Sequence, residues 1–190
     1  MSNIDIIRAM IGREDRQRSG KAYKQAAVLV GIIQTANGDR IVFNRRAPHM
    51  NNHGGEICLP GGLLESIDRK SHINAALRET HEEIGLPPEN VQVFGMLESC
   101  ITSRRLEVTP VVGLVSLPPD WTLQPDEVAE VVELPLDVFL EARNYQKVAR
   151  HYHGRKVNSV AITCNHYEIW GLTAKIMMQL QQTLEEHSTI

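Results

Sequence analysis

Apolar residues along the chain fall into short runs of the length typical of strands. Residues 26–34 form a nearly unbroken run rich in Ala, Val and Ile, which predicts a strand buried on both faces. Asn37-Gly38 is a strong hairpin turn, and it leads into a second predicted strand over residues 40–46. Similar runs predict further strands and two more hairpins, at residues 91–101, 106–117, 128–134, 145–152 and 156–163.

Helical periodicity separates these strand runs. The longest central helix is predicted to begin at Ser71, or one turn earlier at Asp68, and to end at Gly85. Other helices are predicted near residues 3–11, 136–142 and 174–186. Since mixed strands alternate with helices, the pattern predicts an α/β fold, an α/β/α sandwich with a mixed central sheet. We expect a single domain over residues 1–190, with an N-terminal helix and a basic lead-in over residues 1–24.

Three glutamates share one face of the central helix. Glu79, Glu82 and Glu83 are spaced i, i+3 and i+4, so their side chains project in the same direction. Like charges at this spacing destabilise a helix by roughly 0.2 to 0.5 kcal/mol per pair. Because carboxylate clusters suit hard cations such as Mg²⁺, the pattern indicates a metal site. Before the helix, Pro60-Gly61-Gly62 predicts a tight bend at which backbone can approach a phosphate or offer a carbonyl to a metal.

The stretch from residue 61 to residue 86 resembles the Nudix box. The family pattern is Gly, five residues, Glu, seven residues, and then Arg-Glu-aliphatic-x-Glu-Glu-x-Gly-aliphatic. Residues 78–86 match the second half closely, with Thr80 in place of the aliphatic residue. In the first half, Asp68 stands where the pattern has Glu, and nine residues rather than seven separate Asp68 from Arg78.

The resemblance implies hydrolysis of a diphosphate that joins a nucleoside to another group. It implies Mg²⁺ or Mn²⁺ as the cofactor, with Glu82 and Glu83 as ligands. Glu79 would be a further ligand, directly or through water, and Gly61 would add its carbonyl oxygen. Glu79 is also a candidate base for the attacking water, and Arg78 would hold Glu79 in position.

The resemblance also implies a further carboxylate from a loop distant in sequence. Glu127 is the candidate for this catalytic role, and Glu130 is its rival. Cations for the substrate phosphates are expected where the strand over residues 40–46 ends. Arg46 is the first candidate there and Arg45 the alternate, while Gly62 would let the substrate approach the backbone closely.

Within the family, the chain is similar to bacterial coenzyme A diphosphatases over residues 24–180. The branch marker is Leu-Leu-Thr-x-Arg-Ser, three residues, Arg, three residues, Gly, three residues, Phe-Pro-Gly-Gly. Arg46, Gly55 and the residues 60–62 fit this marker. The departures are Asn44 for Thr, Ala47 for Ser, Asn51 for the second Arg and Leu59 for Phe. This similarity implies cleavage of coenzyme A or acyl-coenzyme A to 3′,5′-ADP and (acyl-)4′-phosphopantetheine.

Composition narrows the possible partners. A net charge of −3 over 190 residues gives no overall basic field, so nucleic-acid binding is not indicated. Three widely spaced cysteines argue against a disulfide framework or a structural zinc site. No signal peptide or long apolar run is visible, so we expect a cytoplasmic protein that acts on a small-molecule nucleotide away from membranes. A homodimer is left open.

Two functional classes remain open from the sequence. The first is a diphosphohydrolase dependent on Mg²⁺ or Mn²⁺, and the second is a nucleotide-binding regulator with the same fold and no catalysis. The intact residues Arg78, Glu79, Glu82 and Glu83 favour the enzyme. Within that class coenzyme A leads, with ADP-ribose, nucleotide sugars and dinucleotides as alternatives.

Overall fold

A mixed sheet forms the centre of the computed structural model, which describes residues 3–11, 23–116, 120–152 and 155–188. Within these residues β1 (Lys24–Ile33) and β7 (Leu106–Val115) pair in parallel along their whole length, while the other neighbours run antiparallel. The other strands of this sheet are β2 (Arg40–Arg46), β3 (Ile57–Cys58), β4 (Gly61–Leu63), β5 (Val91–Met96), β6 (Cys100–Ile101) and β8 (Val128–Pro135).

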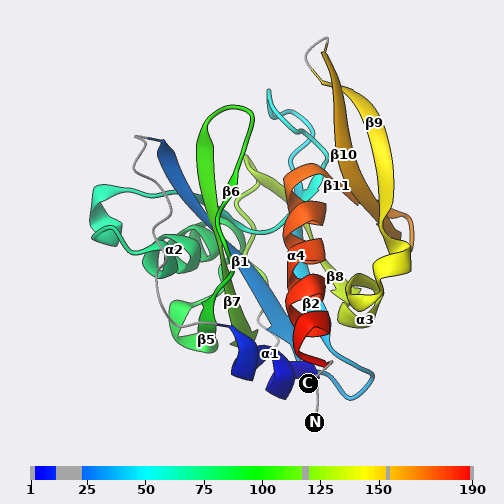
Figure 1. Ribbon diagram of the computed structural model, residues 1–190. Coiled ribbons are helices and arrows are strands. Elements are labelled where there is room, and N and C mark those ends of the chain that lie inside the picture. Colours follow the sequence, from blue (N-terminus) through cyan, green and yellow to red (C-terminus); the bar gives the residue numbers. More distant parts are fainter. Residues whose placement is uncertain (1–2, 12–22, 117–119, 153–154, 189–190) are drawn as a thin grey trace.

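Helices cover both faces of this sheet. Figure 1 shows α2 (His72–Ile84) and α4 (Gly171–Ser188) on opposite sides of the central strands. The face opposite α2 is also covered by α1 (Asn3–Met10) and α3 (Leu136–Leu140). In β1, Ala27 and Leu29 pack toward α2, whereas Val30 and Ile32 pack toward α4. Burial on both faces explains the unbroken apolar run, and the α/β/α sandwich predicted from the sequence is confirmed.

A second, smaller sheet lies beside the sandwich (Figure 1). It contains β9 (Gln146–Tyr152), β10 (Arg155–Cys164) and β11 (Tyr167–Trp170), and α4 follows β11 directly. The hairpin predicted at residues 145–163 is present, although its tip at residues 153–154 lies outside the described residues. No helix in the described part of the chain is long and apolar enough to cross a membrane.

The structure differs from the sequence prediction in two local ways. The apolar run at residues 91–101 is divided into β5 and β6, because the pairing with β7 is interrupted between them. The short strands β3 and β4 were not predicted, since two or three residues beside Gly and Pro give no periodic signal. Most of the predicted basic lead-in falls at residues 12–22, outside the described residues.

The loop before α2 absorbs the two extra residues of the stretched Nudix box. Ser66–Asp68 forms a short 3-10 helix, and Arg69 and Lys70 then adopt left-handed conformations with φ of 53° and 64°. This turn brings the chain to Ser71, whose side chain caps α2 by accepting a hydrogen bond from the Asn74 N–H at 3.2 Å. Of the two cap positions left open by the sequence, the helix uses Ser71.

Candidate active site

The carboxylates of α2 lie in three different environments. The Glu82 side chain is 57% exposed, that of Glu79 is 17% exposed, and Glu83 is buried. Arg78 Nη1 lies 3.0 Å from Glu79 Oε1 and 3.0 Å from Glu82 Oε2. Burial raises the pKa of Glu79, and the Arg78 charge opposes that rise. The expected contact between Arg78 and Glu79 is therefore present, and its role in catalysis stays a prediction.

Arg78 also fastens the preceding loop to the helix. Its Nε and Nη2 donate to the two carboxylate oxygens of buried Asp68, each at 3.0 Å, and its Nη2 donates to the Leu63 carbonyl at 3.0 Å. The guanidinium of Arg78 holds the pKa of Asp68 below its usual range. In the sequence, Asp68 was an alternative helix cap and the acidic residue in the first half of the Nudix box, and neither role predicted its contact with Arg78.

Glu83 is held by neutral donors instead of a cation. The Asn44 amide and the Gly61 N–H both donate to its Oε2, at 2.8 and 2.9 Å. Burial raises the pKa of Glu83 to about 7, and repulsion from Glu127 and Glu79 adds to the rise. Glu83 is therefore a buried carboxylate whose negative charge is opposed by its surroundings.

The glycines of β4 let backbone and carboxylate meet without side-chain atoms between them. Gly61 has φ of 144°, and a Cβ there would lie 2.3 Å from the Ala27 carbonyl oxygen across the sheet. A Cβ on Gly62 would lie 2.3 Å from Glu79 Oε2. Gly61 therefore needs to be glycine because backbone atoms lie in the way, whereas a side chain at position 62 would have to displace the Glu79 carboxylate. The metal-binding carbonyl of Gly61 and the substrate contact of Gly62 stay predictions.

The segment before β8 crosses the C-terminal end of α2 and carries Glu127 to the carboxylate face. The N–H groups of Thr122 and Gln124 donate to the carbonyls of Ile84 and Glu83, at 3.0 and 2.9 Å. These bonds satisfy carbonyls that the end of a helix leaves without partners. Because the segment docks there, the Glu127 charge raises the pKa of both Glu79 and Glu83.

Glu130, the rival of Glu127, faces a different part of the molecule. Its carboxylate accepts a 2.7 Å hydrogen bond from the Tyr167 hydroxyl and forms an ion pair with Arg45 at 2.9 Å. These three side chains and Trp170 help to line a cavity of about 540 Å³ between the central sheet and β11. The geometry thus separates Arg45 and Glu130 from the carboxylates of α2 and leaves Glu127 beside them.

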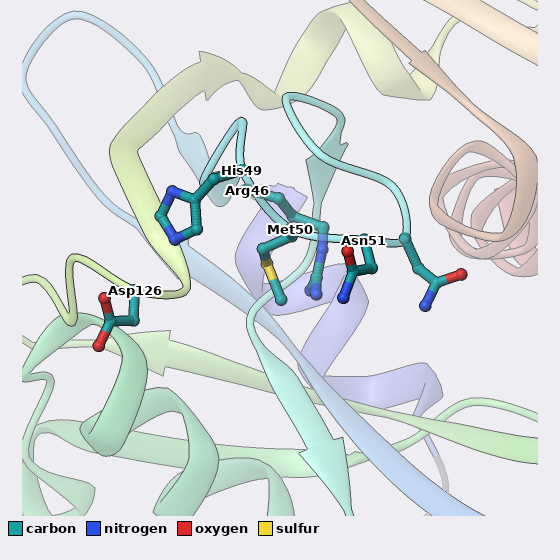
Figure 2. A pocket seen from close by; sticks show the side chains of 6 residues that line it. Arg46, His49, Met50, Asn51 and Asp126 are labelled. Atoms are coloured by element: carbon teal, nitrogen blue, oxygen red, sulfur yellow. The ribbon is translucent and has the colours of Figure 1, made fainter.

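Arg46 belongs to another cavity, which adjoins the carboxylates. Its guanidinium lowers the pKa of Glu83 and of the Cys58 thiol, in both cases against a larger opposing effect of burial. On the other side of the cavity Asp126 directly precedes Glu127. The cavity has a volume of about 530 Å³ and is lined by Arg46, His49, Met50, Asn51, Asn52 and Asp126. Figure 2 shows these lining side chains from close by.

A second arginine reaches the wall of this cavity from the β6–β7 hairpin. Arg104 donates from both Nη1 and Nη2 to the Asn52 side-chain oxygen, each at 3.3 Å. Figure 1 shows the tip of this hairpin and the loop after β2 at the same end of the sheet. The contact has no signal in the sequence, because 52 residues separate Arg104 from Asn52.

A divalent cation fits the donor set of this site. Glu79, Glu82, Glu83 and Glu127 supply hard oxygen atoms, and the raised pKa of Glu83 reflects burial and repulsion that a cation would relieve. In the part of the chain that the structure describes, no group of three or more His, Cys, Asp or Glu side chains is placed so that it could hold a metal ion by itself. An open arrangement is typical of magnesium sites, in which water and substrate phosphates complete the coordination.

Comparison with known proteins agrees with the geometry. The NUDIX domain model matches residues 24–153. The chain is 35% identical over 182 residues to "Uncharacterized Nudix hydrolase NudL" of Enterobacter sp. (strain 638), covering 95% of this chain and 90% of that protein. The protein of the same name from Salmonella heidelberg (strain SL476) is 33% identical over 180 residues, with the same coverage.

Solved structures show the same fold at lower identity. A MutT/nudix family protein from Enterococcus faecalis superposes with a TM-score of 0.57 at 17% identity, covering 90% of this chain and 66% of that one. A NUDIX hydrolase from Alicyclobacillus acidocaldarius gives a TM-score of 0.54 at 18% identity, covering 64% and 83% of the two chains. With Arg78, Glu79, Glu82 and Glu83 together on α2, the family model and the NudL relatives show that the chain belongs to the Nudix family and is a hydrolase of diphosphates linked to nucleosides.

Proposed function

We propose that this chain hydrolyses the diphosphate of coenzyme A or acyl-coenzyme A, giving 3′,5′-ADP and (acyl-)4′-phosphopantetheine. Family membership accounts for the diphosphate cleavage. The observation that carries the finer assignment is the cavity at Arg46, which adjoins the carboxylates of α2 through Arg46 on one side and Asp126 on the other. Coenzyme A carries a diphosphate and a separate 3′-phosphate. It therefore needs a site that cleaves the diphosphate, for which the carboxylates of α2 are the candidate, and a neighbouring site for the 3′-phosphate, for which the cavity at Arg46 is the candidate.

Glu79, Glu82 and Glu83 would hold Mg²⁺ or Mn²⁺, with the Gly61 carbonyl as a further ligand. When bound, such an ion polarises phosphoryl oxygens and lowers the pKa of coordinated water. The protein contributes the fixed placement of these groups. Arg78 restrains Glu79, while Asn44 restrains Glu83. A restrained carboxylate needs little reorganisation when the substrate arrives.

The reaction requires one proton to be removed from water. Water attacks a phosphorus atom, the bridging P–O bond of the anhydride breaks, and each half of the substrate leaves with its own phosphate group. Glu79 and Glu127 are the carboxylates available to accept the proton, because both border the site and neither is fixed by two neutral donors as Glu83 is. Glu127 is exposed, so it is reachable by water.

In this proposal, arginine side chains at the cavity give the enzyme its selectivity for coenzyme A. Arg46 would read the 3′-phosphate, since a guanidinium binds phosphate through paired hydrogen bonds. Asn51 stands where the branch marker has a second arginine, and it lines the same cavity. Arg104 contacts the adjacent Asn52, so the β6–β7 hairpin supplies a second guanidinium at this wall from a distant part of the chain.

A substrate panel tests the proposal. Phosphorus-containing products are measured for coenzyme A, dephospho-coenzyme A, ADP-ribose, NADH and dinucleotide polyphosphates, each with Mg²⁺, with Mn²⁺ and with EDTA. We expect coenzyme A to have the highest kcat/KM and EDTA to abolish turnover. Brisk cleavage of ADP-ribose beside intact coenzyme A would overturn the substrate assignment and leave the diphosphatase assignment standing.

A further inference from the structure

Asn44 is a buried amide at an interior position of β2. Only 1% of the residue is exposed, and across the sheet it pairs with Cys58 on β3 and Val131 on β8. Its Nδ2 donates the 2.8 Å hydrogen bond to Glu83 Oε2. Its Oδ1 is also buried, and no hydrogen-bond donor among the described residues reaches it. A strand position between two neighbouring strands normally holds an apolar side chain, so packing alone does not account for an amide here.

Both donors to Glu83 act on the same oxygen. Asn44 Nδ2 and the Gly61 N–H bind Oε2, and no hydrogen bond from the described residues falls on Oε1. The carboxylate is thereby fixed through one oxygen while the other remains available as a ligand. The donors are also neutral. They orient the carboxylate without pairing it directly with a cation, whereas Arg78 contacts Glu79 and Glu82 with a full positive charge.

We infer that Asn44 is a positioning residue for the divalent cation: it fixes Glu83 through Oε2 so that the other carboxylate oxygen, Oε1, is presented to the ion. This inference rests on the proposed cation site and adds a residue outside the Nudix box to it. Groups that hydrogen-bond to metal ligands typically change metal affinity or activity by about 10- to 100-fold when they are removed. Asn44 is assigned to that class of group.

The test is Mn²⁺ binding to the substrate-free protein, measured by isothermal titration calorimetry and by the electron paramagnetic resonance signal of free Mn²⁺. The variant is Asn44→Leu, which keeps the size of the side chain and removes both the donor and the orphaned oxygen. We expect the Mn²⁺ Kd to rise about 10- to 100-fold. The Tm of the metal-free protein should change little, because removing the buried Oδ1 that lacks a partner offsets the loss of the hydrogen bond to Glu83.

Asn144→Leu is the matched control. The Asn144 Nδ2 donates to the Val138 carbonyl, also at 2.8 Å, in the connection between α3 and β9, away from the carboxylates. This variant loses a hydrogen bond of equal length, so its Tm should fall while its Mn²⁺ affinity matches the wild type.

The outcomes separate the inference from the proposed function. Unchanged Mn²⁺ affinity in Asn44→Leu, with normal binding by the wild type, overturns the positioning role and leaves the cation site intact. A lower Tm with unchanged affinity shows that Asn44 serves stability alone and likewise overturns the inference. Failure of the wild type to bind Mn²⁺ overturns both the cation site and the inference.

Discussion

Arg78 and Asp68 form a paired contact in which Nε meets Oδ1 and Nη2 meets Oδ2, each at 3.0 Å. The contact joins the loop that follows the glycine bend to the helix that carries the carboxylates. Its geometry leaves Nη1 of Arg78 facing Glu79 and Glu82. Direct contacts therefore join the loop, Arg78 and the carboxylate face of α2 into one unit, although ten positions separate Arg78 from Asp68.

The first prediction concerns this unit. Asp68→Asn should destabilise the protein by about 1.5 to 3 kcal/mol, the usual contribution of charge-assisted hydrogen bonds. The folded-state pKa of Asp68 is lowered, so its contribution to the free energy of unfolding is complete well above the unfolded pKa near 3.8 and is lost as the pH falls through the folded value. Urea unfolding of wild type and variant should therefore differ at pH 7 and converge toward pH 2. A difference that does not depend on pH would contradict this account.

The second prediction concerns the carboxylate ligands. Glu82→Gln and Glu83→Gln should each lower turnover by orders of magnitude, because an amide cannot supply the negative charge that a divalent cation requires. The fold should persist, since Glu82 is largely exposed and burial already disfavours the charged form of Glu83. Circular dichroism and steady-state kinetics check both points. Full activity of both variants would contradict the proposal that Glu82 and Glu83 bind the metal ion.

The third prediction concerns the glycine beside Glu79. Gly62→Ala places a Cβ 2.3 Å from Glu79 Oε2 and must displace that carboxylate. We expect a drop in kcat of at least about tenfold, the effect of roughly 1.4 kcal/mol on the barrier. Gly31→Ala is the control, because its Cβ would meet its nearest neighbour at 3.4 Å, away from the site. Equal kcat values for the two variants would show that the position of Glu79 does not limit turnover.

The fourth prediction concerns the arginines at the cavity. Arg46→Ala and Arg104→Ala should each lower kcat/KM for coenzyme A by more than for dephospho-coenzyme A. For Arg46→Ala, the loss in kcat/KM should be about 10- to 100-fold larger for coenzyme A than for dephospho-coenzyme A, the range expected when a charge-assisted contact is lost. For Arg104→Ala the difference between the two losses should be smaller. Arg105→Ala is the control on the same hairpin, and it should leave the ratio of the two substrates unchanged. Equal losses on both substrates would show that neither arginine reads the 3′-phosphate.

The elements that the sequence predicted well are those with a local periodic signal. The apolar run of β1, the Asn37-Gly38 turn and the end of α2 at Gly85 each depend on residues that are close in the chain. Gly85 illustrates the limit of such reasoning. Its φ of 72° follows from its place after a helix, but a Cβ there would also lie 2.8 Å from Thr122, and that close approach is visible only in the fold.

The parts of the site that escaped prediction depend on distant residues. Asn44 meets Glu83 across 39 positions, and Arg104 meets Asn52 across 52. Neither pair has a spacing that a helix or strand repeat could reveal. The different positions of Arg45 and Arg46 could not be predicted from the sequence either, because they depend on the pairing of β2 with β8. The register of that pairing shifts between these two residues. Because they are neighbours in the sequence, both were candidates for binding the substrate phosphates. In the fold their side chains line two different cavities.

The most direct measurement is ³¹P nuclear magnetic resonance of coenzyme A incubated with the protein and Mg²⁺, beside a sample containing Glu83→Gln. With the wild type, we predict that the diphosphate resonances disappear and that the phosphomonoester resonances of 3′,5′-ADP and 4′-phosphopantetheine replace them. With Glu83→Gln the diphosphate should remain over the same period. A diphosphate left intact by the wild type, or consumed equally fast by Glu83→Gln, would contradict cleavage of coenzyme A at the carboxylate face of α2.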